Sequence, residues 1–195
     1  MEFWFDFGSN YSYLSVMRIS ALARAAGVEV EWRPFLLGPV FKTLGMHNSP
    51  FVEQKLKGAY VWQDMVRECR KYGLPWQQPT DFPRLSLLPV RVALLGEGQP
   101  WMVPFCERIM LRNFASDQDI GSEASVAEVL DALHLDAAAI IAAAQSDTNK
   151  LRLRERNEQA QQRGIFGAPT FFVGHEMFWG NDRLDDAIAA AALDK

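Results

Sequence analysis

The sequence predicts an α/β fold in which an all-helical region is inserted into a small sheet-containing part. Three observations predict this: short apolar and aromatic segments near both ends are typical of strands, the middle shows only helical patterns, and the composition shifts from aromatic to Ala-rich between them. The chain of 195 residues is long enough for one domain that carries an insertion. We expect residues 1–37 and 164–195 to form the sheet-containing domain and residues 38–163 to form the helical domain.

The first forty residues are predicted to form a strand, a helix and a second strand. Residues 2–7 are apolar and aromatic, and a Gly-Ser-Asn turn follows them. From residue 11 to residue 26, apolar side chains recur at helical spacing, and Gly27 is suited to end the helix in the left-handed conformation. Residues 28–32 then alternate between apolar and polar, as strands do, before Pro34 ends the pattern.

Helical patterns separated by Gly, Pro and polar residues fill the middle of the chain. No strand pattern interrupts them, so we expect one helical block. The predicted helices cover residues 50–72, 85–95, 101–114, 123–133, 136–144 and 147–162.

After these helices the chain returns to strand patterns. Residues 167–173 form a predicted strand that begins near a proline, residues 176–179 a second short strand, and residues 182–193 a closing helix. The resulting order is β-α-β, then helices, then β-β-α. This is the order of a thioredoxin-like fold with an inserted all-helical domain.

Composition and charge argue against several classes of partner. Lys and Arg number 20 against 24 Asp and Glu, so the net charge is −4 and no basic field exists to attract nucleic acid or anionic lipid. The longest apolar stretch, residues 137–144, is less than half of the ~20 residues that a membrane span needs. We therefore expect a folded soluble protein with neither nucleic acid nor a membrane as its partner.

The cysteines and histidines form no motif. Cys69 and Cys106 make neither a CxxC pair nor a disulfide framework, and the N-terminus lacks the pattern of a secretion signal, which favours a cytoplasmic location. His47, His134 and His175 are scattered without the spacing of metal ligands. No metal site is expected.

Ser9 lies between the first strand and the first helix, where two interpretations are open. It could be an ordinary helix cap that contributes roughly 1 kcal/mol. Alternatively, its hydroxyl, beside unpaired N–H groups at the positive end of the helix dipole, could hold an anion such as a thiolate. The spacing alone does not distinguish the two.

Two further features could take part in ligand binding, and the first of them, the Ala168-Pro169 bond, falls in the same predicted cleft as Ser9. The Ala168-Pro169 bond could belong to an ordinary edge strand, but it is also a candidate for a cis bond that turns the backbone at Ala168 outward to pair with an extended ligand. Asn181 and Asp182 begin the last helix, where they could be caps or could anchor the amino and carboxylate groups of a ligand.

Six motifs spread over nearly the whole chain belong together. They are Ser9-Asn-Tyr-Ser-Tyr-Leu14, Asn48, Lys57-Gly-Ala-Tyr60, Asp64, Gly164-Ile-Phe-Gly-Ala-Pro-Thr170 and Phe178-Trp-Gly-Asn-Asp-Arg183. As a set they resemble the 2-hydroxychromene-2-carboxylate isomerases and their relatives, the kappa-class glutathione transferases. The last two motifs are the most specific part of the resemblance.

The resemblance implies a role for each matching residue. Ser9 corresponds to the family's catalytic serine, whose hydroxyl faces the sulfur of the cofactor glutathione. Ala168, before a cis Pro169, corresponds to the backbone partner of the glutathione cysteine. Asn181 and Asp182 correspond to ligands of its γ-glutamyl end.

Asn48 and Lys57, nine positions apart, are implied as contacts for the substrate or for the glycyl carboxylate of glutathione. Without the resemblance, a lysine in this segment would be interpreted as part of a solvated helix face. The chain departs from the family at two positions: Asn10 stands where a proline is usual, and Leu85 stands where Asn or Thr usually precedes the Ser-Leu pair. The resemblance also implies a homodimer.

The chain must borrow the sulfur that this chemistry needs. Disulfide oxidoreductases with this fold carry CxxC at the first turn, but residues 9–12 contain no cysteine. A free thiol has a pKa near ~8.5, and a hydrogen bond from Ser9 of roughly 1.5–3 kcal/mol plus the helix terminus would lower it by roughly one to three units. Bound glutathione would then be mainly thiolate.

These expectations lead to a glutathione-dependent isomerase that interconverts 2-hydroxychromene-2-carboxylate, or a close aromatic analogue, and trans-o-hydroxybenzylidenepyruvate. Reversible addition of the thiolate would make the conjugated double bond single, allow rotation, and restore the bond on elimination. Phe35, Phe41, Tyr60 and Trp179 are available as an apolar wall for the ring. The alternatives are a kappa-type glutathione transferase that conjugates electrophiles and a non-catalytic thioredoxin-like binding module.

Overall fold

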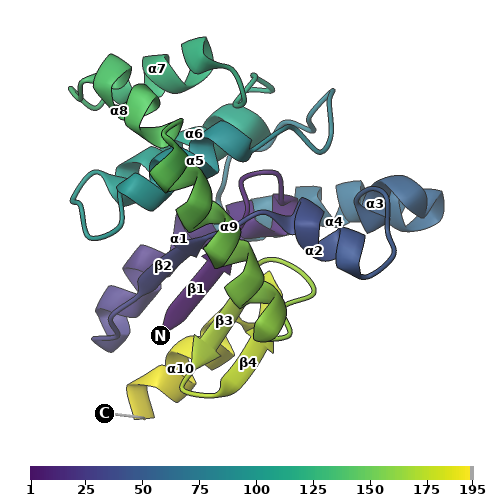
Figure 1. Cartoon of the computed structure of the whole chain (residues 1–195). Helices are drawn as coiled ribbons and strands as arrows, with labels where there is room; N and C mark the ends of the chain where they lie inside the picture. Colours follow the sequence, from purple (N-terminus) through teal and green to yellow (C-terminus); the bar gives the residue numbers. More distant parts are fainter. Residues whose placement is uncertain (194–195) are drawn as a thin grey trace.

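The computed structural model describes residues 1–193 and contains one four-stranded sheet in the order β2-β1-β3-β4. Its strands are β1 (Glu2–Phe5), β2 (Glu31–Pro34), β3 (Thr170–Val173) and β4 (Glu176–Trp179). β1 pairs with β2 in parallel and with β3 antiparallel, and β4 is antiparallel to β3 (Figure 1). The expected α/β fold with an inserted helical region is confirmed.

The helices of the described chain fall into a long central run and one at each end. They are α1 (Asn10–Ala26), α2 (Leu37–Thr43), α3 (Pro50–Glu53), α4 (Lys55–Tyr72), α5 (Leu87–Leu95), α6 (Met102–Phe114), α7 (Glu123–Asp131), α8 (Ala137–Ala144), α9 (Asp147–Gln162), a 3-10 turn η1 (Asn181–Arg183) and α10 (Leu184–Leu193). None of the helices in residues 1–193 is both long enough and apolar enough to cross a membrane.

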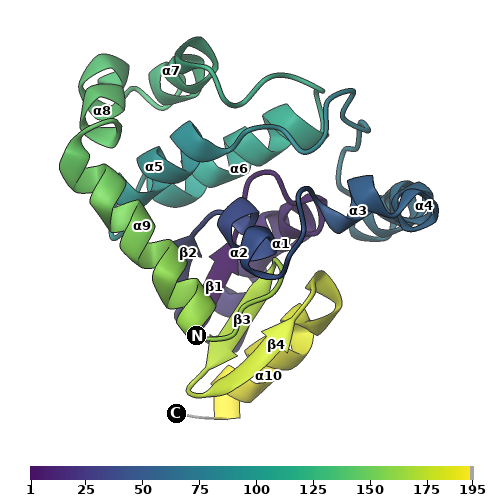
Figure 2. The ribbon, with the colours of Figure 1, turned by 45° about the vertical axis from the view of Figure 1, so that its right-hand side comes forward.

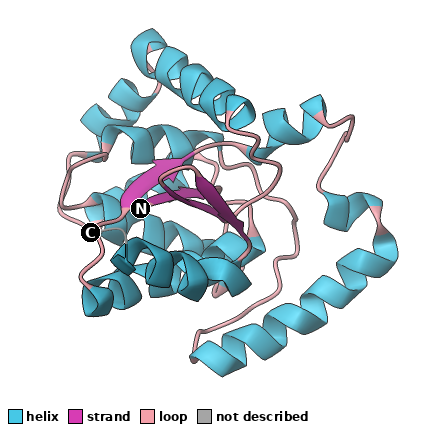
Figure 3. Ribbon diagram, turned by 90° about the horizontal axis from the view of Figure 1, so that it is seen from below, coloured by secondary structure: helices cyan, strands magenta, loops and turns pink. Residues whose placement is uncertain are grey.

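Both faces of the sheet are covered, as Figure 3 shows from below. Because side chains alternate along a strand, Phe3 and Phe5 contribute to the large core that includes α1, α6 and α10, whereas Trp4 packs into a second cluster with residues of α2 and α9. Phe171 stacks on Phe3 across the β1–β3 pair at a centroid distance of 5.2 Å. The alternation of β1 therefore fixes the helix layers on its two sides.

The helical region is continuous with the sheet in its packing. The large core contains side chains from β1, α5, α6, α7 and α8 in one cluster. Figure 2 shows α3 and α4 extending away from the sheet, while α9 runs from the distal α7–α8 pair back to it. The division at residues 37/38 and 163/164 stays a prediction about domains.

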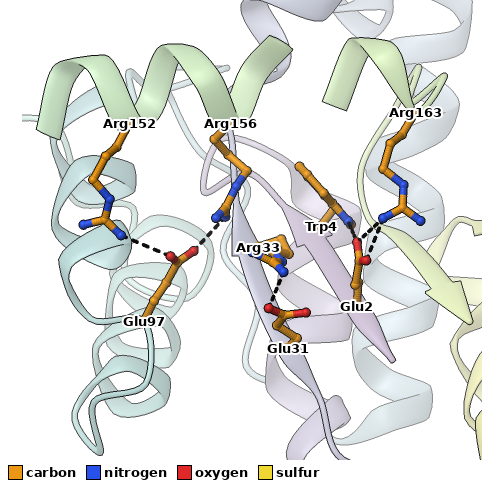
Figure 4. A network of polar contacts seen from close by, with 8 residues as sticks. All are labelled: Glu2, Trp4, Glu31, Arg33, Glu97, Arg152, Arg156 and Arg163. Carbon is orange, nitrogen blue, oxygen red and sulfur yellow. Dashed lines mark hydrogen bonds and ion pairs between the residues drawn. The ribbon is translucent and has the colours of Figure 1, made fainter. Parts of the chain in front are cut away.

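Ionic contacts fasten α9 to the rest of the molecule (Figure 4). Arg156 and Arg152 contact Glu97 at 2.7 and 3.3 Å, beyond the end of α5. Just past α9, Arg163 contacts both carboxylate oxygens of Glu2 at 2.6 and 2.7 Å, and Trp4 donates its indole N–H to the same carboxylate at 2.7 Å. The helix that leads into β3 is thus anchored at its middle and just past its C-terminal end.

The structure corrects the prediction of the second strand. The expected strand is present, but its predicted bounds, residues 28–32, are wrong, because β2 begins at Glu31 and includes Pro34. The N–H of Val28 instead bonds the carbonyl of Ala23, so the residues after Gly27 complete the end of α1. Pro34 is tolerated because it is the last residue of the strand.

The predicted single helix at residues 50–72 is wrong as well. Gln54 interrupts it with φ −101° and ψ 85°, leaving a short α3 and a long α4. Gly58 of α4 approaches α3 so closely that a Cβ there would lie 2.1 Å from the carbonyl oxygen of Phe51. α2 was not predicted, because Gly38-Pro39 reads as a break; Pro39 lies in the first turn, where its missing N–H costs nothing.

Candidate active site

A cavity of about 1260 Å³ lies between the first turn of α1, the segment before β3 and the α2–α4 helices. The expected site residues Ser9, Ala168, Asn181, Asp182, Asn48 and Lys57 all line it. Pro169 is not among the residues that line it. The structure therefore brings together residues that lie up to 173 positions apart, since Ser9 and Asp182 face one cavity.

Ser9 is the N-cap of α1 and is 7 % exposed. Its hydroxyl oxygen accepts from the Ser12 N–H at 3.2 Å and donates to the Ala168 carbonyl at 3.0 Å. It therefore fulfils the structural role of a cap and also faces the second predicted contact. The N–H groups of the first helical turn, at Asn10 and Tyr11, lie at the same edge of the cavity, where the helix dipole favours an anion.

The Ala168-Pro169 peptide bond is cis. The Pro169 carbonyl accepts from the Gly180 N–H at 2.9 Å, which ties the start of β3 to the residue before η1. Both segments that were expected to bind the cofactor thus lie side by side.

Asn181 and Asp182 occupy different environments. Asn181 is 4 % exposed, and its side-chain oxygen accepts from Ser15 and Arg18, both at 3.1 Å. Asp182 is exposed and has Arg183 as its neighbour. Of these two side chains, the exposed one of Asp182 can therefore reach a ligand's amino group, whereas Asn181 holds η1 against α1.

Asn48 and Lys57 line the side of the cavity opposite Ser9. They belong to the segment from α2 to α4, residues 37–72, which we call the arm. Both are exposed. The side-chain oxygen of Asn48 accepts from the Ser49 N–H at 2.7 Å, and Lys57 lies 5.9 Å from the centre of the Phe51 ring. Lys57 thus presents a cation at the cavity, suited to a carboxylate.

Aromatic side chains line the cavity mouth. Trp179 is 51 % exposed and packs edge-on against Phe166, with 4.8 Å between ring centroids. Tyr60 and Phe41 also line the cavity. Phe35, which we considered for this wall, is fully buried in the smaller core cluster beside Trp4 instead.

Two lining residues were not singled out from the sequence. The Tyr11 hydroxyl donates to the Asp64 carboxylate at 2.7 Å, and burial together with this hydrogen bond raises the pKa of Tyr11, so the phenol stays neutral. Asp6, three residues before Ser9, is buried and accepts from the Gly8 N–H at 2.9 Å. The signal for Asp6 was present in the sequence: an Asp two residues before a glycine at a strand end is typical of an Asx turn.

None of the described residues that line the cavity is a cysteine. Cys69 and Cys106 lie in the core, where burial raises the pKa of the Cys69 thiol to about 12 and that of the Cys106 thiol well above its usual value. The polar groups of the cavity fit glutathione. The Ser9 hydroxyl and the helix N–H groups suit a sulfur anion, the Ala168 backbone suits the peptide, and the exposed Asp182 carboxylate suits an amino group.

The fold and this site define a thioredoxin-like protein that has a serine at the turn where a thiol would stand. A model of the DSBA-like thioredoxin domain matches residues 1–191. The 2-hydroxychromene-2-carboxylate isomerase of Sphingobium xenophagum is 31 % identical over 185 residues, covering 95 % of this chain and 94 % of that protein. The chain belongs to the DSBA-like thioredoxin domain family and, as the sequence motifs suggested, to its 2-hydroxychromene-2-carboxylate isomerase branch.

Two further similarities agree. A solved structure of a 2-hydroxychromene-2-carboxylate isomerase matches with a TM-score of 0.88 at 28 % identity, covering 97 % of this chain and 92 % of that chain. The glutathione S-transferase kappa 2 of Caenorhabditis elegans is 26 % identical over 198 residues, covering 94 % of this chain and 88 % of that protein.

Proposed function

We propose that this protein is a glutathione-dependent isomerase that interconverts 2-hydroxychromene-2-carboxylate, or a close aromatic analogue, and trans-o-hydroxybenzylidenepyruvate. The observation that carries the proposal is the Ser9 hydroxyl at the N-terminus of α1, 3.0 Å from the Ala168 carbonyl in a cavity without a cysteine. The similarity to proteins named for this reaction supports it. When bound, glutathione supplies a thiol whose ionised form can add reversibly to a conjugated carbon.

The residues of this chain divide the work between two sides of the cavity. On the sheet side, Ser9 turns its hydroxyl proton from the Ala168 carbonyl towards the sulfur, and the N–H groups of the first α1 turn add their positive dipole. Because a hydroxyl donates without taking up a proton at neutral pH, Ser9 stabilises the anion and leaves the protonation of the substrate unchanged.

On the arm side, Lys57 and Asn48 hold the substrate's carboxylate and the oxygen that becomes negative during the reaction. Tyr60, Phe41 and Trp179 cover the aromatic ring. Asp182 and the backbone at Ala168 hold the peptide part of glutathione. We further propose a homodimer in the cytoplasm; the two buried free cysteines suit a reducing compartment.

The decisive experiment is incubation of the protein with 2-hydroxychromene-2-carboxylate, with and without glutathione, while the trans keto acid is followed spectrally. We expect conversion only with glutathione, and an unchanged amount of free glutathione at the end. Conversion that proceeds equally well without glutathione would contradict the proposal.

The second candidate is a transferase of the kappa type, favoured by the similarity to the Caenorhabditis elegans protein. It predicts that free glutathione is consumed in proportion to the electrophile. A non-catalytic binding module, in which Ser9 is only a cap, predicts that the protein leaves the ultraviolet absorbance of glutathione thiolate unchanged near neutral pH.

A further inference from the structure

Asp6 is a buried carboxylate at the end of β1 that forms no ion pair within residues 1–193. It accepts three hydrogen bonds: from the Gly8 N–H at 2.9 Å, from the Leu37 N–H at 2.7 Å and from the Ser86 hydroxyl at 2.6 Å. An isolated carboxylate is costly to bury unless such donors compensate it. Because the burial of the Asp6 carboxylate costs free energy, packing alone does not explain why an acidic residue stands at this position.

The three donors come from three separate walls of the cavity. Gly8 belongs to the turn that carries Ser9, Leu37 begins α2 at the base of the arm, and Ser86 precedes α5. Leu37 and Ser86 are 31 and 80 positions from Asp6 along the chain. One carboxylate therefore joins the turn that carries Ser9 to the start of α2 and to the segment before α5.

The neighbouring helix ends show that these bonds replace local ones. Leu36, the N-cap of α2, has no side-chain oxygen, and Asp6 accepts the N–H of the first helical residue in its place. Ser86 is the N-cap of α5, yet its hydroxyl makes no capping bond, because it donates to Asp6. At the N-termini of both α2 and α5, a hydrogen bond to the Asp6 carboxylate therefore takes the place of a local side-chain cap.

We propose that Asp6 is a positioning residue, whose carboxylate holds the Ser9 turn, the start of α2 and the start of α5 in the one arrangement that is competent for catalysis. Asp6 acts through Gly8: the backbone carbonyl of Asp6 accepts the Ser9 N–H at 3.0 Å, and its side chain closes the same turn through the Gly8 N–H. Its kinetic test rests on the proposed function, whereas its spectroscopic test does not.

The first experiment keeps the charge of the site constant. In Ser86→Ala, Asp6 loses one donor but stays in place, so kcat with saturating glutathione is expected to fall roughly tenfold while KM for glutathione stays within about twofold. Ser86→Thr, which keeps the hydroxyl, is expected to restore kcat. A fall in Ser86→Ala that Ser86→Thr does not reverse would overturn the proposal.

The second experiment removes the carboxylate. Asp6→Asn leaves one acceptor oxygen for three donors, so kcat is expected to fall further than in Ser86→Ala, by roughly thirtyfold or more. Because Ser86 acts through Asp6, the double variant Asp6→Asn/Ser86→Ala is expected to be no slower than Asp6→Asn alone. Losses that multiply in the double variant would show two independent effects and would refute the proposal.

The chain offers a matched control in α7. Ser125 is also a buried serine that donates its hydroxyl to a carboxylate, that of Asp119 at 2.8 Å, but it lies outside the cavity. Ser125→Ala is expected to lower the melting temperature about as much as Ser86→Ala while leaving kcat unchanged. An equal loss of kcat in both variants would mean that general stability, and not positioning, is measured.

A readout without turnover separates this proposal from the proposed function. In the free protein, the amide protons of Gly8 and Leu37 are expected to exchange with solvent at least tenfold faster in Asp6→Asn than in the wild type, while those in α7 keep their rates. Unchanged exchange at both amides would contradict the proposal even if the protein proves to be an isomerase. Faster exchange in a protein without isomerase activity would refute only the proposed function.

Discussion

The Ser9 hydroxyl has one proton and two possible acceptors. In the structure the Ser9 hydroxyl donates this proton to the Ala168 carbonyl oxygen, which lies 3.0 Å from the hydroxyl oxygen. The hydroxyl oxygen also accepts from the Ser12 N–H. A bound sulfur anion competes for the proton as a charged acceptor, which forms the stronger hydrogen bond. The carbonyl therefore holds the hydroxyl in one orientation in the free protein.

Ser9→Ala removes this donor. Turnover is expected to slow by a hundredfold or more, because the thiolate loses a charge-assisted hydrogen bond, while the free energy of unfolding falls by only ~1 kcal/mol from the lost cap. Steady-state kinetics and urea unfolding measure the two effects.

Ser12→Ala is the matched control for this change. Ser12 is a fully buried serine of the same turn, and its hydroxyl has no hydrogen-bond partner among the described residues. The Ser12→Ala variant is expected to have the same turnover rate as the wild type. Full activity in Ser9→Ala would remove Ser9 from the mechanism.

Gly167 leaves space for an aromatic wall. A Cβ at this position would lie 2.4 Å from the indole nitrogen of Trp179, so Gly167→Ala must displace this half-exposed ring, which packs against Phe166. KM for the aromatic substrate is expected to rise several-fold, with little change in the affinity for glutathione. A shift in tryptophan emission would report the displacement, and an unchanged KM alongside such a shift would exclude Trp179 from substrate binding.

At the level of single elements, α7 shows how a short helix is fixed at its start. The Asp119 carboxylate accepts from the Gly121 and Ser122 N–H groups, both at 3.0 Å, and from the Ser125 hydroxyl at 2.8 Å. The hydroxyl of Ser122 also bonds to it, and these hydrogen bonds hold the pKa of Asp119 well below its usual value.

The lowered pKa gives a pH-dependent stability. Since the folded pKa is depressed, the contribution of Asp119 is complete above its ordinary pKa and is lost as the pH falls through the lower folded value. Asp119→Asn is expected to reduce the free energy of unfolding by about 1 kcal/mol at neutral pH and by progressively less in strongly acidic buffer. A deficit that stays constant with pH would contradict the assignment.

Elements whose signals are local could be predicted, and those that depend on distant partners could not. α9 was predicted residue for residue, because a serine cap and a clear end bound it. β2 was displaced, since its register is set by pairing with β1 rather than by the alternation at residues 28–32. α2 has no capping side chain of its own and depends on Asp6, which lies in another element.

The candidate site shows the same distinction. Ser9, Ala168, Asn181 and Asp182 belong to motifs. The fold order was enough to expect Ser9 and Ala168 in one cleft, and the family resemblance implied the roles of Asn181 and Asp182. The hydrogen bonds from Leu37 and Ser86 to the Asp6 carboxylate could not be predicted, because these two donors become neighbours of Asp6 only when the helices pack. Nor could the buried orientation of Asn181, whose partners Ser15 and Arg18 lie on α1.

At the scale of the whole molecule, arginines tie α9 to Glu97, beyond the end of α5, and tie the residue after α9 to Glu2 of β1. Arg156 is 7 % exposed, and its charge is balanced by Glu97 at 2.7 Å. Glu97→Gln leaves this buried cation without its counter-ion, so the free energy of unfolding is expected to fall by about 2–3 kcal/mol, measured by urea unfolding.

Asp147→Asn, which breaks an exposed pair with Lys150 on the same helix, is expected to change stability little. Equal effects in the two variants would show that burial of the pair does not matter. A loss of isomerase activity in Glu97→Gln at temperatures where it stays folded would reveal that α9 also transmits position to Ala168.

The cavity is lined by segments of two origins: the residues around Ser9, Ala168 and Trp179 come from the two ends of the chain, and residues such as Lys57 and Tyr60 come from the α2–α4 arm. An exchange of the arm would therefore leave the residues around Ser9 and Ala168 in place. Chimeras that carry the arm of a relative, with the Leu37 N–H still bound to Asp6, offer a route to enzymes of altered substrate range from one inherited reaction centre.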